Sequence, residues 1–249
     1  MPAMGSKIAI VTGGGGGIGG AIVRRFAQEG ARLAVADIDA AAAKACASAV
    51  AKDGTDAIAL TTDVTDKTSV EKMVKATIER WGRIDILVNV AGGADRKFVI
   101  DMTAPDWDHI VDMNLKSVFL CSQAVLPMML KQKYGKIVSI SSIYGFTGNA
   151  TRSSYAAAKA GVAVFTKSLA LEVVKEGINV NAVAPGRVAT DRVRGHYTDE
   201  AWSEAVAQIP MNRTGTPEEI ASTVLFLVMD ENKYITGQTI HVNGAWLNH

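Results

Sequence analysis

Short apolar runs alternate with longer helical segments along almost the entire chain. Runs such as 32–37 (RLAVAD) and 84–89 (IDILVN) are rich in β-branched and aliphatic residues, which is typical of buried strands. Each run is followed by a segment long enough to be a helix, so we expect parallel strands joined by right-handed crossovers. The alternation predicts an α/β fold, a doubly wound parallel sheet with helices on both faces.

The same pattern places the individual elements. Ligands in such folds bind beyond the carboxyl ends of the strands, near the point where the strand order reverses. No linker, repeat or low-complexity tract interrupts the pattern, so we expect one domain covering residues 1–249. Pro127 is expected to kink or end its helix. Strands are predicted at 7–12, 32–37, 56–61, 84–89, 135–141, 178–184 and 238–242, and helices at 17–30, 40–52, 67–81, 105–131, 154–176 and 217–228, with one or two short helices in 186–210.

A glycine-rich segment, 12–19 (TGGGGGIG), lies between the first predicted strand and the first predicted helix. Glycines here permit a tight turn and let the backbone approach a pyrophosphate, while the helix N-terminus offers free N–H groups. A glycine run is also compatible with a merely flexible turn, but its position favours a dinucleotide site. We therefore expect Gly13, Gly17, Ile18 and Gly19 to bind the cofactor.

Asp37 ends the second predicted strand, where an acidic side chain commonly binds the hydroxyls of the adenosine ribose. The alternative role is to cap the next helix, which Asp39 can do instead. A carboxylate at Asp37 would repel a 2′-phosphate, and no arginine stands at Gly16 or Ile38 to receive one. The sequence therefore predicts NAD rather than NADP, with Asp37 and Ile38 beside the adenosine.

Tyr155 and Lys159 are four residues apart in a predicted helix, so their side chains project from the same face. A neighbouring ammonium lowers the pKa of a phenol, whose ordinary value of ~10 is too high for a base at neutral pH. Such a phenol can take a proton from an alcohol or give one to a carbonyl. Alone, the pair is far more often an aromatic and a solvated charge. Ser142, 13 residues before Tyr155, and the rest of the chain favour the catalytic interpretation.

Composition argues against several other classes of function. With 26 basic and 25 acidic residues, a net charge of +1 and no long basic run, the chain is not expected to bind nucleic acid. No uninterrupted apolar stretch of about 18 residues and no signal peptide are found, so we expect no membrane span and a cytoplasmic location. Cys46 and Cys121 fit a reducing compartment. The four histidines are scattered, so no metal site is predicted.

Together, these motifs resemble the short-chain dehydrogenase/reductase family across essentially the whole chain. The resemblance implies a single Rossmann-like domain with about seven parallel strands, and a homotetramer assembled through the helices predicted at 105–131 and 154–176. The matching pieces, in the family's order and near its spacings, are 12–19 (TGxxxGxG), Asp37, Asp63-Val64, 89–92 (NVAG), Asn114, Ser142, Tyr155-x-x-x-Lys159 and Pro185-Gly186.

The resemblance also implies catalytic roles. Tyr155 is the general acid/base, and Lys159 lowers its pKa and binds the nicotinamide ribose. Ser142 orients the substrate oxygen, and the spacing to Tyr155 favours it over its neighbour Ser141. Asn114 holds a water that joins Lys159 to a proton relay. 

Further cofactor contacts follow from the same resemblance. Asp63 and Val64 are expected at the adenine, and Asn89 at the edge of the adenosine ribose, where it also ties neighbouring strands together. Val90 stands where most relatives have a second Asn; we expect this to be tolerated, because the adjacent backbone can still bind. The remaining expected contacts are Ala91, Gly92, Val188 and Thr190.

The substrate-binding loop and lid are expected at about 187–213. Arg152, three residues before Tyr155, is the best single candidate to clamp a carboxylate, sulfonate or phosphate, with Ser142 and Tyr155 as the other substrate contacts. Solvated surface charge is the alternative, because acidic residues are interspersed. The segment carries Arg187, Arg192, Arg194, His196 and Arg213 as its basic residues, and Tyr197, Trp202 and Met211 as possible cover for an apolar ring.

We therefore predict an oxidoreductase that interconverts a secondary alcohol and a ketone by hydride transfer with NAD(H), acting on a small molecule that is anionic if the arginines bind it. One alternative resembles a 3-oxoacyl-carrier-protein reductase; that reaction normally runs on NADPH, against which Asp37 argues. A sugar or polyol dehydrogenase is also compatible. A non-catalytic NAD-binding protein is disfavoured by the intact set of Asn114, Ser142, Tyr155 and Lys159.

Overall fold

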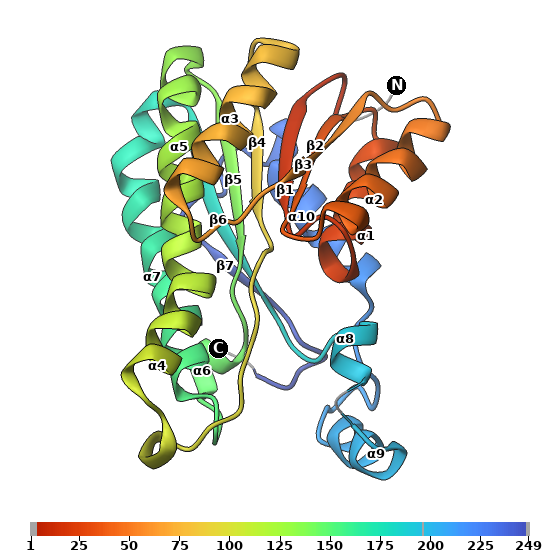
Figure 1. Ribbon diagram of the computed structural model, residues 1–249, viewed down its shortest axis with the longest axis vertical. Coiled ribbons are helices and arrows are strands. Elements are labelled where there is room, and N and C mark those ends of the chain that lie inside the picture. The colour runs from red at the N-terminus through yellow and green to blue at the C-terminus, as the bar shows by residue number, and fades with distance from the viewer. Residues whose placement is uncertain (1–3, 196, 248–249) are drawn as a thin grey trace.

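The computed structural model describes residues 4–195 and 197–247 and shows one sheet of seven parallel strands (Figure 1). The strand order is β3-β2-β1-β4-β5-β6-β7, so the order reverses between β1 and β4. This confirms the predicted fold class. The strands are β1 (Ile8–Thr12), β2 (Arg32–Asp37), β3 (Ala57–Thr61), β4 (Ile86–Asn89), β5 (Gly135–Ile140), β6 (Ile178–Pro185) and β7 (Thr239–Val242).

Two hydrophobic cores form because alternate residues of each strand point to opposite faces of the sheet. In β1, Ala9 and Val11 belong to one core, and Ile10 belongs to the other. The helices α1 (Gly17–Gln28), α2 (Ala40–Lys52) and α10 (Pro217–Val228) cover the first face, and α3 (Lys67–Trp81), α5 (Ser117–Gln132) and α7 (Ser153–Val173) cover the second (Figure 1). Strands buried on both faces explain the nearly continuous apolar runs of the sequence.

A continuous helical stretch runs through α4 (Ala104–Val111), a π-helical turn (Asp112–Lys116) and α5. Thr103 and Asp106 begin it with a capping box. The helix continues past Pro127 to Gln132, so the proline does not end it. The 29 residues are long and apolar enough to cross a membrane by length and composition alone; a core helix passes the same test, and 44% of the tested window is buried inside the protein.

Short helices gather at the carboxyl ends of the strands (Figure 1). They are α6 (Tyr144–Thr147) after β5, and α8 (Asp191–Arg194) and α9 (Asp199–Ala207) after β6. The sequence predicted α8 and α9 in the 186–210 loop but not α6, the π-helical turn or the 3₁₀ turn Val99–Asp101. The fold thus places these irregular elements where ligands bind in doubly wound sheets.

Candidate active site

A cavity of about 1030 Å³ opens beyond the carboxyl ends of the strands. It is lined by the glycine-rich loop after β1, the loops after β2, β3 and β4, the start of α7, and the segment after β6. Among the residues predicted to contact cofactor or substrate, only Asn89 is absent from its lining. Those present are Gly13, Gly17, Ile18, Gly19, Asp37, Ile38, Asp63, Val64, Ala91, Gly92, Asn114, Ser142, Arg152, Tyr155, Lys159, Val188 and Thr190.

The glycine-rich loop fits a pyrophosphate. A Cβ on Gly19 would overlap the carbonyl oxygen of Gly13, so only glycine lets α1 begin this close to the loop. At the other side of the turn, a Cβ on Gly16 would meet nothing within 4 Å, so the cavity is open beside the backbone there. The N-terminus of α1 has no side-chain cap and no acidic residue in its first turn, which leaves its N–H groups free to bind an anion.

Asp37 lines the cavity, where the sequence predicts the adenosine, and also organises the glycine-rich loop. Its Oδ2 accepts a hydrogen bond from the Gly15 N–H at 2.9 Å, and its Oδ1 accepts one from the Asp39 N–H at 3.1 Å. Asp39 caps α2 by accepting from the N–H groups of Ala41 and Ala42. The capping role that was the alternative for Asp37 therefore belongs to Asp39.

Asp63 and Val64 line the same end of the cavity. The Asp63 carboxylate accepts hydrogen bonds from the hydroxyl and N–H of Thr65, which lower its pKa. Asn89 does not line the cavity; its side chain donates to Ser139 Oγ at 3.1 Å and ties β4 to β5, as the sequence predicted, and its contact with the adenosine ribose stays a prediction. Its Oδ1 is buried without a hydrogen-bond partner. The register of β4 and β5 pairs Asn89 with Ser139 and so brings the two side chains together.

The loop after β4 is held by Asn114, which lies in the π-helical turn and is fully buried. Its Nδ2 donates to the carbonyls of Gly93 at 2.7 Å and Ile110 at 2.9 Å, and its Oδ1 accepts from the Gly93 N–H at 3.2 Å. Gly92 is wedged beside it, because a Cβ there would lie 2.7 Å from Asn114 Oδ1 and 3.5 Å from Lys159 Nζ. A π-helical turn at such a place is typical of functional sites; the water predicted at Asn114 stays a prediction.

The Thr12 hydroxyl binds the backbone at Val90, the position where most relatives have a second Asn and where the adjacent backbone was expected to bind instead. Its Oγ1 accepts from Val90 N at 3.1 Å and Ala91 N at 3.4 Å. Those two donors are therefore already used within the protein. Gly13 packs against the same loop, where a Cβ would lie 2.9 Å from Ala91 Cα.

Ser142, Tyr155 and Lys159 converge on the wall of the cavity next to Gly92. Lys159 Nζ lies 5.7 Å from the centre of the Tyr155 ring and donates to the Ile140 carbonyl at 2.7 Å. Ser142 forms a hydrogen bond with Tyr155, whereas the Ser141 hydroxyl donates to the Lys159 carbonyl and satisfies backbone. The structure thus places Ser142, and not Ser141, at the tyrosine.

The net direction of the Tyr155 pKa is upward, whereas the lowering expected from Lys159 stays a prediction. Burial raises the pKa of Tyr155, because loss of hydration of the phenolate outweighs the Ser142 hydrogen bond and the positive charge of Arg152, which both lower it. Burial also lowers the pKa of Lys159 to about 8. The helical spacing predicted correctly that the two side chains share a face, but it does not contain the desolvation that determines their charge.

Comparison with known proteins agrees with this arrangement. A family model described as enoyl-(acyl carrier protein) reductase matches residues 13–246. The 3-oxoacyl-[acyl-carrier-protein] reductase FabG of Staphylococcus aureus is 42% identical over 244 residues, 96% of this chain and 98% of the relative. The corresponding reductase of Synechocystis is 41% identical over 248 residues, 98% of each chain. The crystal structure of gox2181 superimposes with a TM-score of 0.94 at 39% identity, covering 97% of this chain and 96% of that one.

The chain belongs to the short-chain dehydrogenase/reductase family. It is therefore an oxidoreductase with a nicotinamide cofactor.

In this family member, the segment after β6 lines the part of the cavity where the sequence predicts the nicotinamide. Val188 is 5% exposed and pairs in a β-bridge with Gly215. Thr190 caps α8 and faces the glycine-rich loop, where a Cβ on Gly17 would lie 3.5 Å from its methyl group. Both predicted residues therefore line the cavity, and Thr190 uses its hydroxyl to accept from the Val193 N–H.

The predicted basic residues of the lid segment (residues 187–213) divide into two groups. Arg187 and Arg192 line the cavity, and Arg192 donates to the Gly92 carbonyl at 3.0 Å. Arg194 and Arg213 lie outside it and form ion pairs with Asp199 and Glu219. His196 lies outside the described residues.

Of the residues that the sequence suggested as cover for an apolar ring, some lie at the cavity and one does not. Tyr197 lines the cavity, and Trp202 packs edge-on against it with ring centres 5.6 Å apart. Met211 is 57% exposed and does not line the cavity.

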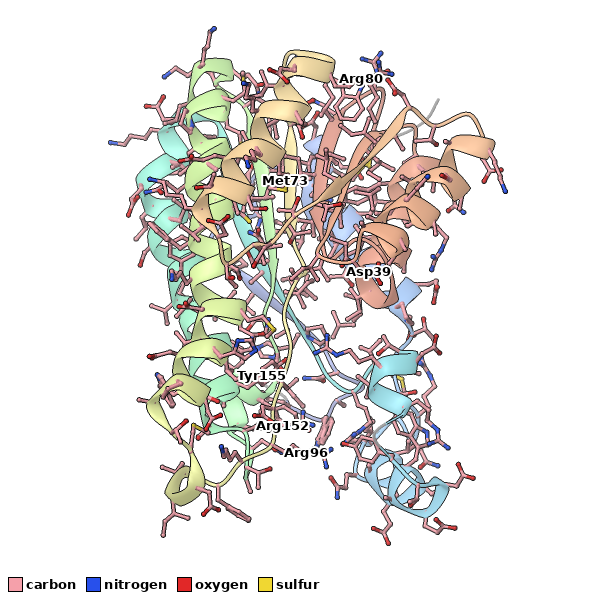
Figure 2. The ribbon with its side chains drawn as sticks, viewed as in Figure 1. Asp39, Met73, Arg80, Arg96, Arg152 and Tyr155 are labelled. Atoms are coloured by element: carbon pink, nitrogen blue, oxygen red, sulfur yellow. The ribbon has the colours of Figure 1, made fainter. Side chains whose placement is uncertain are left out.

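Sequence reasoning missed two side chains at the mouth. Tyr144 of α6 lines the cavity with its ring 5.6 Å from the Arg152 guanidinium. Arg96 donates to the Tyr197 hydroxyl at 2.8 Å. No local signal marks Arg96, because its partner is 101 residues away. Figure 2 shows Tyr155, Arg152 and Arg96 following one another toward the end of the molecule at which α9 lies.

Proposed function

We propose that this protein interconverts a secondary alcohol and a ketone by hydride transfer with a nicotinamide cofactor, with Tyr155 as the proton donor and acceptor. The convergence of Tyr155, Ser142 and Lys159 beside Gly92, in the same cavity as the glycine-rich loop, carries the proposal. The cofactor supplies the hydride chemistry, and the protein orients the substrate and handles the proton.

The three catalytic residues divide the work between them. Ser142 and Tyr155 both present a hydroxyl to the substrate oxygen, where negative charge develops as the ketone is reduced. Tyr155 donates the proton in reduction and accepts it in oxidation. The raised pKa keeps the phenol protonated, which suits donation to a ketone. Lys159 holds a positive charge beside the phenol and binds the nicotinamide ribose.

Tyr155→Phe tests this assignment. The variant keeps the ring and loses the hydroxyl that donates and accepts the proton, so we expect kcat to fall by at least about 1000-fold while NADH binding, followed by fluorescence, stays within about twofold. Ser141→Ala is the matched control, since its hydroxyl faces the Lys159 carbonyl and not the substrate. Turnover close to that of the wild type in Tyr155→Phe would remove Tyr155 from the chemistry.

The proposed cofactor is NAD. The Asp37 carboxylate lies at the adenosine end of the cavity, is held there by Gly15 and Asp39, and forms no ion pair with a cation among the described residues. A 2′-phosphate would meet this negative charge, and Arg24, which also lines the cavity, pairs with Glu218 at 3.7 Å. We expect kcat/KM to be at least about tenfold higher with NADH than with NADPH. A ratio in favour of NADPH would refute this role of Asp37.

For the substrate, the names of the relatives favour the 3-oxoacyl interpretation over a generic secondary alcohol. We propose that the substrate is a 3-oxoacyl compound, in which the ketone is carbon 3 of the acyl group. A rate assay with acetoacetyl-CoA, ethyl acetoacetate and unactivated 2-butanone tests this class. Faster reduction of 2-butanone than of both 3-oxo compounds would reject it. A cytoplasmic location and a homotetramer stay predictions from the family resemblance.

A further inference from the structure

The Tyr197 hydroxyl lies between two guanidinium groups at the mouth of the cavity. It accepts hydrogen bonds from Arg187 at 2.7 Å and from Arg96 at 2.8 Å. Arg152 is near enough for its charge to act on both Tyr197 and Tyr155. We call Arg96, Arg152 and Arg187 the guanidinium cluster; its members come from three distant parts of the chain.

Arg187 is held rigidly among aromatic rings. Its guanidinium carbon lies 5.0 Å from the ring centre of Tyr197, 5.9 Å from that of Trp202 and 5.5 Å from that of Trp246. Its Nε is buried and has no hydrogen-bond partner. Stacking on aromatic faces fixes a guanidinium without neutralising it. The group is therefore preorganised.

The guanidinium cluster also lacks counterions. None of its three members forms an ion pair with a carboxylate within the described part of the chain, unlike Arg194 and Arg213, which do. Four acidic residues line the cavity. Asp37 and Asp63 lie at the adenosine end, Asp112 pairs with Lys116, and Asp191 lies in the first turn of α8. A neutral phenol oxygen is thus the main acceptor that the protein itself offers to Arg96 and Arg187.

We propose that the Tyr197 hydroxyl occupies the position that an anionic group of the substrate takes when it binds. Arg152 and Arg187 then bind this carboxylate or sulfonate close to the reacting ketone. This deepens the proposed function and rests on it. The phenol accepts two charge-assisted hydrogen bonds; a carboxylate or sulfonate offers more acceptor sites and a full negative charge. A movement of the Tyr197 side chain alone frees both donors, while Arg187 stays packed against Trp202 and Trp246.

This site distinguishes two kinds of 3-oxo substrate. In a carrier-bound 3-oxoacyl thioester, the group next to the ketone is uncharged. In a free 3-oxo acid, or in a sulfonate of similar length, an anion lies two or three bonds from the ketone. The guanidinium cluster therefore favours the free acid or sulfonate over the thioester.

The test compares acetoacetate with acetoacetamide, which has the same ketone and nearly the same shape but no charge. Initial rates with NADH give kcat/KM for both, in the wild type, Arg152→Gln, Arg187→Gln and Arg187→Lys. Arg213→Gln is the control, because Arg213 pairs with Glu219 away from the cavity. Tyr197→Phe separates a role in anion binding from a role in holding the lid. Calorimetric titration with butanoate and with propane-1-sulfonate measures binding without turnover and tells the two anions apart.

We expect the wild type to prefer acetoacetate by at least about tenfold. Each Arg→Gln change should reduce that preference by about 10- to 100-fold through KM, with acetoacetamide unaffected, as loss of a charge-assisted hydrogen bond implies. Arg187→Lys should restore part of it, and Tyr197→Phe should leave anion affinity unchanged or higher. Butanoate or propane-1-sulfonate should bind the wild type and fail to bind Arg152→Gln.

Two results would overturn the inference: no preference in the wild type, or an equal loss on both substrates in the Arg→Gln variants, which indicates a structural role in the lid. Turnover of neutral 3-oxo compounds without anion preference rejects the inference and leaves the proposed function standing. Anion binding by calorimetry with no turnover of any ketone rejects the proposed function and keeps the anion site.

Discussion

Replacing Asn114 by alanine tests how the catalytic wall is held in place. The side chain is fully buried, and the change removes three hydrogen bonds, two to Gly93 and one to the Ile110 carbonyl. A neutral hydrogen bond contributes about 1 kcal/mol, and a buried group left without a partner costs about 1–3 kcal/mol. Gly93 is half-buried and can be partly rehydrated. We therefore expect the free energy of unfolding to fall by about 3 kcal/mol.

The same substitution should weaken cofactor binding. Gly92 and Gly93 form the wall next to Lys159. Without the Asn114 side chain, one backbone position must be ordered when the cofactor binds, which costs about 1–2 kcal/mol of conformational entropy. This corresponds to a rise of about 5- to 30-fold in the KM for NADH. Urea denaturation gives the stability, with a midpoint lower by about 1 M if the slope is about 3 kcal/mol per M. Steady-state kinetics give the KM.

Asn149→Ala is the matched control, since Asn149 is exposed in the turn before α7 and should change neither quantity. Asn114→Asp keeps the shape but turns an oxygen toward two carbonyls, so it should be at least as damaging as alanine. An Asn114→Ala protein with wild-type stability and wild-type KM would refute the reasoning, because it would show that Gly93 is positioned without the side chain.

Two further predictions follow from the site. Burial lowers the pKa of Lys159 to about 8, so the folded protein releases this proton at lower pH than the unfolded chain. The unfolded state then binds more protons above pH ~8, and the stability of the wild type relative to Lys159→Met should rise with pH, by about 1 kcal/mol between pH ~7.5 and ~9. Urea denaturation at those pH values measures it, and a flat difference would contradict the pKa. Gly19→Ala places a methyl group into the Gly13 carbonyl, so NADH binding should fall by more than about tenfold. Gly54→Ala, at an exposed turn outside the cavity, should lower stability because the φ of Gly54 is +89°, but should leave NADH binding unchanged. Equal affinities in calorimetry would show that the loop adjusts.

Local pattern in the sequence was enough for much of the molecule. Alternating apolar runs and helical segments determine the order of the elements, because each strand is buried on both faces and each connection is long enough for a helix. The glycine-rich loop, Asp37 and the pair Tyr155 and Lys159 could be located for the same reason, since their spacing along one element fixes their relative positions. These features predicted the family and the parallel sheet of about seven strands, and the match to the family model and the observed strand order confirm both.

Other properties were decided only by tertiary structure. Arg96 and Arg187 meet at Tyr197 although Arg96 is 101 residues from it in the chain, and no periodicity encodes such a contact. Asn89 is bonded to Ser139 and does not line the cavity, because the register of β4 and β5 brings the two side chains together. The pKa of Tyr155 rises because packing around the phenol removes water. Spacing along a helix or strand is a local property, whereas burial and long-range contacts depend on how all the elements pack together.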